Sequence, residues 1–142
     1  MLVVWGLGGA GKTQLVLDYL QCHREKYKAT FWIEAKRKVS VERDLINMYK
    51  LLFNVRISTG MEAVKIDDAV IVVKNWLSSR RDQWLVVFDG ADSIDDEDDG
   101  NFFDLVYYMP ESPGMYIIVI TRSRTAKDIT MLKGVNAGEM NQ

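Results

Sequence analysis

The sequence predicts an α/β domain in which a parallel sheet carries helices on both faces. Short apolar runs alternate with longer stretches of helical period along the whole chain. Each run is hydrophobic throughout, which is typical of strands that are buried on both faces. Polar or glycine-rich segments follow the runs directly. In a parallel sheet these are the positions where ligands bind, so the same segments are the first candidates for a functional site.

The expected elements follow one another in a regular order. Strands are expected at 2–5, 30–33, 84–88 and 115–120, with a short fifth strand at 135–140. Helices are expected at 11–23, 40–52 and from 67 or 68 to 81, with a short helical segment at 102–109. Ser40 is interpreted as an N-cap with Glu42 in the first turn, and Arg80 and Arg81 as cations in the last turn of the third helix. The predicted apolar stripe of the first helix consists of Leu15, Val16, Tyr19, Leu20 and His23.

The composition is that of an ordinary soluble globular domain. Of the 142 residues, 48% are hydrophobic and 27% are charged, which argues against wholesale disorder. A formal net charge of −2 argues against a general binder of nucleic acid or of an anionic membrane. The single cysteine excludes an internal disulfide framework and fits a reducing compartment. No apolar run approaches the roughly 20 residues that cross a bilayer. We therefore expect one cytoplasmic domain, residues 1–142, with no nucleic-acid or membrane partner.

A phosphate-binding loop is the strongest motif in the chain. Residues 6–13 read Gly-Leu-Gly-Gly-Ala-Gly-Lys-Thr and match the full pattern G-x-x-x-x-G-K-[ST]. Glycines leave no Cβ between the backbone amides and a phosphate, and the following helix adds the positive end of its dipole. Lys12 then supplies a mobile charge for the β- and γ-phosphates, and the Thr13 hydroxyl completes a Mg²⁺ shell. The predicted nucleotide-binding residues of the loop are Gly6, Gly8, Gly9, Ala10, Gly11, Lys12 and Thr13. The motif makes the expected fold a three-layer P-loop NTPase.

Polar side chains at two further strand ends complete the predicted site. Asp89 ends an apolar strand in the manner of a Walker B aspartate, which holds Mg²⁺ through water opposite Thr13. Asp92 is placed either to accept a proton from attacking water or to cap the next segment. Arg122 or Arg124, after the fourth strand, either reaches the γ-phosphate or is a solvated loop arginine. The predicted catalytic residues are Lys12, Asp89, Asp92 and Arg122, and the predicted metal ligands are Thr13 and Asp89.

Together these segments resemble the NB-ARC branch of the STAND class of P-loop NTPases, the nucleotide switch of NLR-type immune and cell-death regulators. Residues 6–15 are similar to the G-x-G-G-x-G-K-T-x-L loop of that family, and Gln14 therefore joins the nucleotide-binding set. Phe-Trp-Ile at 31–33 is similar to the aromatic second strand of fungal members. Residues 88–92 resemble the Walker B stretch, closer to the NACHT pattern D-G-x-D-E, with Ser93 in place of the second acid. Residues 119–122 are similar to the T-T-R sensor, which favours Arg122 over Arg124.

The resemblance implies a switch in signal transduction and innate immunity. In such a switch ADP is bound tightly in an off state, ATP replaces it, and slow Mg²⁺-dependent hydrolysis resets the domain. It also implies self-association on activation in the full-length protein, of which this chain is expected to be the core, shortened at both ends. Because Ser93 replaces an acid, the sequence leaves open whether the domain is an ATPase. The alternatives are a small phosphoryl-transfer kinase and an ADP-holding pseudo-NTPase without hydrolysis.

Three other features are interpreted as structural rather than functional. The acidic run 95–99 is expected to be a solvated loop, because densely packed like charges repel one another. Residues 36–38, Lys-Arg-Lys, are expected to form an exposed loop. Cys22 and His23 point about 100° apart on a helix and are expected to be packing residues.

Overall fold

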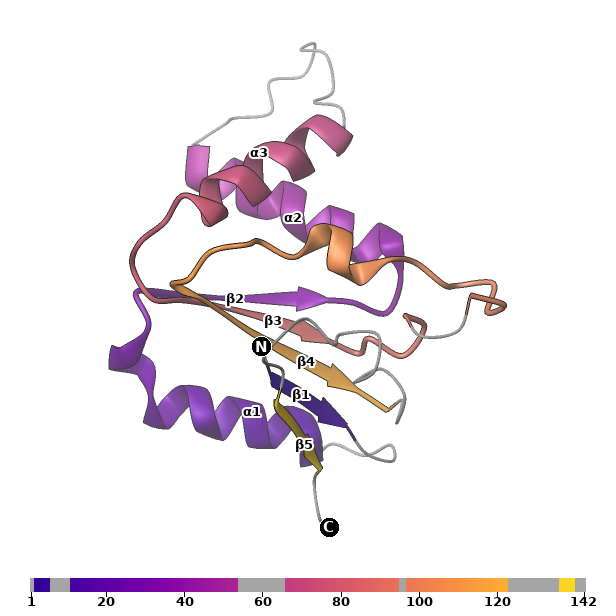
Figure 1. Cartoon of the computed structure of the whole chain (residues 1–142), viewed down its shortest axis with the longest axis horizontal. Helices are drawn as coiled ribbons and strands as arrows, with labels where there is room; N and C mark the ends of the chain where they lie inside the picture. Colours follow the sequence, from indigo (N-terminus) through magenta and orange to yellow (C-terminus); the bar gives the residue numbers. More distant parts are fainter. Residues whose placement is uncertain (1, 6–10, 54–65, 95–96, 123–135, 140–142) are drawn as a thin grey trace.

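A computed structural model describes residues 2–5, 11–53, 66–94, 97–122 and 136–139. Five strands form one parallel sheet in the order β2-β3-β4-β1-β5. The strands are β1 (Leu2–Trp5), β2 (Ala29–Glu34), β3 (Trp84–Asp89), β4 (Met115–Thr121) and β5 (Asn136–Glu139). The helices are α1 (Gly11–Cys22), α2 (Lys38–Phe53) and α3 (Ile66–Ser78), with short 3₁₀ segments η1 (Arg24–Lys26) and η2 (Leu105–Tyr108). Helix α1 lies on one face of the sheet, and α2, α3 and η2 lie on the other (Figure 1). The predicted fold class is therefore confirmed.

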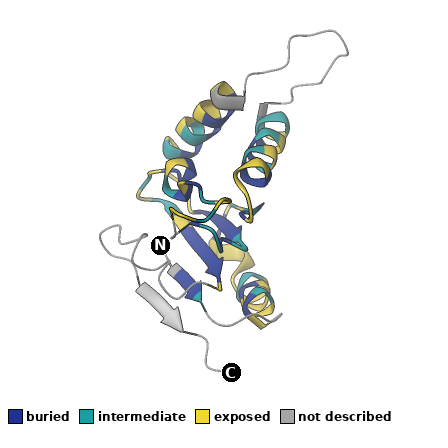
Figure 2. Ribbon diagram, turned by 90° about the vertical axis from the view of Figure 1, so that its right-hand side faces the viewer, coloured by how far each residue is buried: buried dark blue, intermediate teal, exposed yellow. Residues whose placement is uncertain are grey.

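Each face of the sheet has its own hydrophobic layer. Val86 and Phe88 of β3 pack with the cluster under α2, α3 and η2, whereas Leu85 and Val87 pack with Val16 of α1. Successive residues of a strand point to opposite faces, so a strand with helices on both sides must be apolar at every position. This is the physical reason why β3 reads as an unbroken apolar run. Strand β3 is accordingly buried from Trp84 to Phe88, whereas the helices in Figure 2 carry buried, intermediate and exposed residues.

The register brings the carboxyl ends of the strands to a common edge. Glu34 lies opposite Asp89, Asp89 opposite Ile120, and Trp5 opposite Thr121. Strand β4 separates β1 from β3 in the sheet. The carboxyl ends of β1 and β3 therefore lie on either side of the end of β4.

The start of α2 differs from the prediction. The helix begins at Lys38, and Ser40 lies inside its first turn rather than at the N-cap. The Arg37 N–H donates to Ser40 Oγ (3.1 Å), and the Ser40 hydroxyl donates to the Arg37 carbonyl oxygen (2.8 Å). Ser40 thus reaches back to the residue before the helix, as the third residue of a capping box does. Glu42 lies beyond the first turn, so its predicted place there is wrong.

Two other predicted helix ends are also displaced. Helix α3 ends at Ser78, so Arg80 and Arg81 follow the helix instead of lying in its last turn. The Arg80 guanidinium lies over the Trp76 ring, 4.4 Å from its centroid, and this contact holds it near the helix end. The helical segment expected at 102–109 is reduced to η2.

The predicted stripe of α1 is confirmed at Val16, Tyr19 and Leu20, which pack into the cluster on this face of the sheet, and is wrong at Leu15 and His23. Lys12 and Val16 are buried, but Leu15 is 48% exposed. His23 and Cys22 are exposed as well, so their expected packing role is wrong. His23 instead stacks on the Tyr19 ring, with the two centroids 4.3 Å apart. The helix turns its Lys12 side toward the sheet, and the stripe therefore includes residue 12 as well as residue 16.

Candidate functional site

A hollow of about 260 Å³ opens at the carboxyl edge of the sheet. Its walls come from four segments that are distant in the sequence: the start of α1, the residue after the β2 end, the turn after β3, and the end of β4. The hollow brings together five residues of the predicted site, Lys12, Thr13, Asp89, Asp92 and Arg122.

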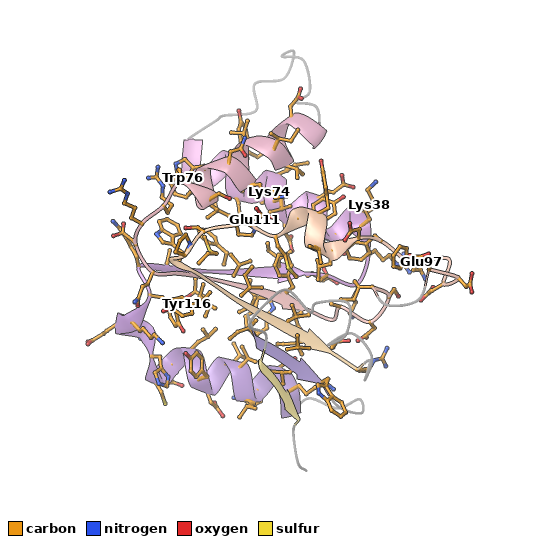
Figure 3. The ribbon with its side chains drawn as sticks, viewed as in Figure 1. Lys38, Lys74, Trp76, Glu97, Glu111 and Tyr116 are labelled. Carbon is orange, nitrogen blue, oxygen red and sulfur yellow. The ribbon has the colours of Figure 1, made fainter. Side chains whose placement is uncertain are left out.

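Two larger hollows lie elsewhere and are less suited to phosphate chemistry. One of about 390 Å³ lies between α3 and η2, where Lys74 and Glu111 contribute to its lining (Figure 3). The Lys74 ammonium there already donates to the Tyr107 carbonyl oxygen at 2.6 Å. The other, of about 500 Å³, lies beside η1 at the starting end of β2. Neither is at the carboxyl ends of the strands, where open parallel sheets bind ligands.

The first wall of the site is the N-terminus of α1. Lys12 is only 6% exposed, and Thr13 is half-buried beside it. A helix N-terminus presents backbone N–H groups and a partial positive charge to an anion. Gln14, by contrast, is exposed and donates its side-chain amide to Asp18 at 2.9 Å, and it is not among the residues that line the hollow. The predicted loop residues Gly6, Gly8, Gly9 and Ala10 lie outside the described residues, and Gly11 is the first residue of α1.

The second wall is the turn after β3. Asp89 is the last residue of the strand, and its carbonyl oxygen accepts the Ala35 N–H at 2.7 Å. Gly90 has a φ of +77°, a conformation that residues with a Cβ rarely adopt. The next residue, Ala91, donates its N–H to the Ile120 carbonyl oxygen at 3.0 Å. These bonds fix the Asp89 side chain at the edge of the hollow, between β2 and β4.

Asp92 and Arg122 form a closed pair on the third wall. The backbone N–H of Arg122 donates to Asp92 Oδ1 at 2.7 Å, and Arg122 Nε donates to Asp92 Oδ2 at 2.9 Å. The Thr121 hydroxyl lies 3.5 Å from Oδ1. Both carboxylate oxygens of Asp92 are therefore engaged at the end of β4, and the Arg122 guanidinium is drawn back onto Asp92. The other candidate sensor, Arg124, lies outside the described residues.

Lys36 is a lining residue that the sequence reasoning missed. It was assigned to an exposed loop, and its side chain is exposed, but it also forms the fourth wall of the hollow. The available signal was its position, three residues beyond the end of the parallel strand predicted at 30–33. That position places it at the same edge as Asp89.

The donor set suits a magnesium ion shared with a phosphate better than a metal cage made by the protein. Within the described residues, no group of three or more histidine, cysteine or acidic side chains is close enough to hold a metal. Mg²⁺ usually takes one or two protein oxygens and completes its shell with water and phosphate. The Thr13 hydroxyl and the Asp89 carboxylate, both on the hollow, are oxygen donors of this kind.

The sheet order, the helix that starts at the hollow and the acid at the end of β3 define the class: this chain has a P-loop NTPase fold. The crystal structure of Cdc6p from Pyrobaculum aerophilum shares this fold, with a TM-score of 0.59 over 96% of this chain and 38% of that chain, at 14% sequence identity.

A similar sequence belongs to a much longer protein. A nucleotide-binding leucine-rich repeat (NLR)-like protein of Hyaloscypha variabilis is 30% identical over 136 residues, covering 88% of this chain. The match spans only 13% of that relative. No family model matches the chain. In the described part of the chain, no helix has both the length and the apolar character needed to span a bilayer.

Proposed function

We propose that this chain is an adenine-nucleotide switch domain of a STAND/NLR-type signalling protein. It binds ADP and ATP together with Mg²⁺ in the hollow at the carboxyl edge of the sheet. The observation that carries the proposal is the convergence of Lys12, Thr13 and Asp89 on that hollow from two separate segments of the chain. Residues 1–142 form one core of this kind, which acts in the cytoplasm and self-associates on activation as part of a longer protein.

The two sides of the hollow divide the work of binding. At the α1 side, Lys12 and the helix N-terminus neutralise the phosphates, and the glycine-rich loop at 6–11 adds backbone amides. Thr13 on the same side and Asp89 across the hollow would hold Mg²⁺ between them, and Mg²⁺ would lower the negative charge of the terminal phosphates. The position of Lys12 supports this division, because its side chain is nearly buried and lines the hollow where the helix begins.

The state of Asp92 supports slow hydrolysis. A general base must take a proton from water, and both oxygens of Asp92 accept hydrogen bonds from Arg122, so Asp92 can act as the base only when this contact opens. Ser93, half-buried next to it, offers no second carboxylate. The output of such a site is therefore the conformation that accompanies nucleotide exchange, and hydrolysis serves to reset it.

Two measurements on the purified full chain test the proposal. First, the chain is denatured and any released nucleotide is identified; ADP is the expected product. Second, chain stripped of nucleotide is titrated calorimetrically with Mg-ADP and with Mg-ATP, and binding of both is expected. The absence of heat with either nucleotide would overturn the proposal. Rapid phosphoryl transfer to a small acceptor would also overturn it, in favour of a kinase.

A further inference from the structure

Lys36 lies along the turn that follows β3. If a Cβ atom were placed at Gly90, it would meet Lys36 Cγ at 3.0 Å, Cε at 3.5 Å and Cδ at 3.8 Å. Cγ, Cδ and Cε of Lys36 therefore lie beside Gly90, in the space that a side chain at this position would enter. This contact carries the side chain from the end of β2 over β3 and toward the hollow.

Gly90 is required here for two separate reasons. Its φ of +77° disfavours any residue with a side chain, and a side chain would also occupy the path of Lys36. Gly90 thus both allows the Walker-B-like turn and leaves room for the Lys36 side chain. The turn at Gly90 therefore determines where the Lys36 side chain lies.

The charges on the hollow identify what Lys36 meets. The cations that line the hollow are Lys12, Lys36 and Arg122. Lys12 lies at the α1 wall, and Arg122 forms an ion pair with Asp92. No ion pair joins Lys36 to a carboxylate among the residues that the structure describes. Its ammonium group is therefore available to a negatively charged ligand.

The order of the strands identifies which part of the ligand Lys36 meets. Lys12 enters from the helix after β1, and Lys36 enters from the end of β2, with β4 and β3 between them. A polyphosphate anchored at the N-terminus of α1 extends across these strand ends, so its far end approaches Lys36. From this geometry we infer that Lys36 binds the terminal phosphate of a nucleoside triphosphate and thereby distinguishes a triphosphate from a diphosphate.

This inference rests on the proposed nucleotide site, and its test separates the two. A non-hydrolysable ATP analogue and ADP, each with Mg²⁺, are titrated into the full chain and into Lys36→Met. The variant keeps the length and apolar stem of the side chain but removes its charge. Affinity for the ATP analogue is expected to fall about tenfold, while affinity for ADP changes less than about twofold.

Lys38→Met is the matched control. Lys38 is an exposed lysine at the start of α2 (Figure 3), two residues from Lys36, and it does not line the hollow. It is expected to bind both nucleotides as the unaltered chain does. Lys36→Arg, which restores the charge, is expected to recover most of the preference for the ATP analogue.

Each remaining outcome is decisive. Unchanged binding by Lys36→Met, or an equal loss for both nucleotides, would overturn the role of Lys36 and leave the nucleotide site intact. Failure of the unaltered chain to bind either nucleotide would instead overturn the proposed function, and this inference with it. Circular dichroism and thermal unfolding of each variant establish that the fold is retained.

Discussion

Lys12 places a full charge where the chain has little solvent to hydrate it. Its side chain is 6% exposed, at a point where α1 begins and three strand ends converge. Little water screens a charge at such a place, so it interacts strongly with an ion of opposite sign in the hollow. A polyphosphate is the ligand best matched to that charge, because the helix N-terminus attracts it to the same place.

Replacing Lys12 by alanine is therefore expected to weaken Mg-ADP and Mg-ATP binding alike. The loss of charge-assisted hydrogen bonds, worth about 1.5–3 kcal/mol, corresponds to a roughly 10- to 100-fold rise in Kd. Isothermal titration measures both values, and Lys38→Ala serves as a control for loss of a surface lysine. A Kd for Lys12→Ala equal to that of the unaltered chain would exclude Lys12 from the site.

Asp92, which follows β3, contacts Arg122, which follows β4. Replacing Asp92 by asparagine removes the negative charge from this contact. Asp92→Asn retains the size of the side chain and one oxygen to accept the Arg122 N–H. We expect the affinity for ADP to be nearly unchanged. Single-turnover ATP cleavage is expected to slow by about 10- to 100-fold, because loss of an acid–base group usually lowers a rate by this much or more. Rapid mixing with a single equivalent of ATP measures the cleavage rate. If cleavage proceeds at the original rate, Asp92 acts only as a cap for the end of β4.

At the scale of elements, the first turn of α2 depends on one hydroxyl group. Ser40 is buried and satisfies both the N–H and the carbonyl group of Arg37. Ser40→Ala is expected to lower the free energy of unfolding by about 1 kcal/mol, the usual cost of losing a helix cap. Urea unfolding measures the change. Ser79→Ala, which removes a hydroxyl bonded to the Trp76 carbonyl oxygen at an exposed position, is expected to cost less than about 0.5 kcal/mol. Equal costs for the two variants would contradict the capping role.

Tyr19 of α1 forms a hydrogen-bonded pair with the buried Tyr27, which lies between η1 and β2. Burial, and then the 2.6 Å hydrogen bond to the Tyr19 hydroxyl, raise the pKa of Tyr27 above its ordinary value. The unfolded chain therefore releases this proton at lower pH than the folded chain does. The stabilisation is complete below about pH 10, the pKa of an unperturbed tyrosine, and is lost as the pH rises further.

Tyr27→Phe is expected to flatten this dependence. Between about pH 9 and 11, the free energy of unfolding should fall less steeply in the variant than in the unaltered chain, because one titrating group is absent. Urea midpoints across this range measure the slope. Tyr107→Phe, at a tyrosine that is 48% exposed, provides the control and should leave the slope as it is. Parallel slopes for all three proteins would show that Tyr27 ionises alike in the folded and unfolded chains.

Elements with a strong apolar pattern were predictable, and their ends were less so. The runs at 84–88 and 115–120 predict β3 and β4 within one residue, because a strand buried on both faces leaves no polar position to confuse the pattern. The predicted start of α2 is wrong because a single sequence does not distinguish a serine at the N-cap from a serine two residues inside the helix. Lys12 is missing from the predicted stripe of α1 because a lysine is ordinarily read as a solvent-facing residue.

The same contrast holds for the site. Asp89, Asp92 and Arg122 could be selected because each lies shortly after the end of an apolar run, and the structure brings all three to one hollow. Lys36 could not be selected, since its place depends on how its stem crosses Gly90. The pairing of Asp92 with Arg122 was also beyond the sequence, because the two residues are 30 positions apart and meet only through the register of β3 with β4.

For the whole molecule, a ligand in the hollow connects segments from residue 12 to residue 122. Binding to the folded state alone raises its stability by RT ln(1 + [L]/Kd), which is about 2.7 kcal/mol at a ligand concentration of 100 Kd. For a domain of this size we therefore expect Mg-ADP to raise the Tm by roughly 5–10 °C. Differential scanning fluorimetry measures the shift, and Lys12→Ala at the same ligand concentration should show much less of it. A Tm independent of nucleotide in the unaltered chain would contradict binding at this site.

The walls of the hollow come from segments that are distant in the sequence, and this determines at which stage of folding the hollow forms. Its walls meet only after β1, β3 and β4 have paired, and those strands are contributed by residues from 2 to 121. Contacts this far apart along a chain form late, because the intervening polypeptide must first be brought to order. A growing or half-folded polypeptide consequently has no pocket with which to capture its ligand. Nucleotide bound in the hollow therefore marks a molecule whose tertiary structure is complete.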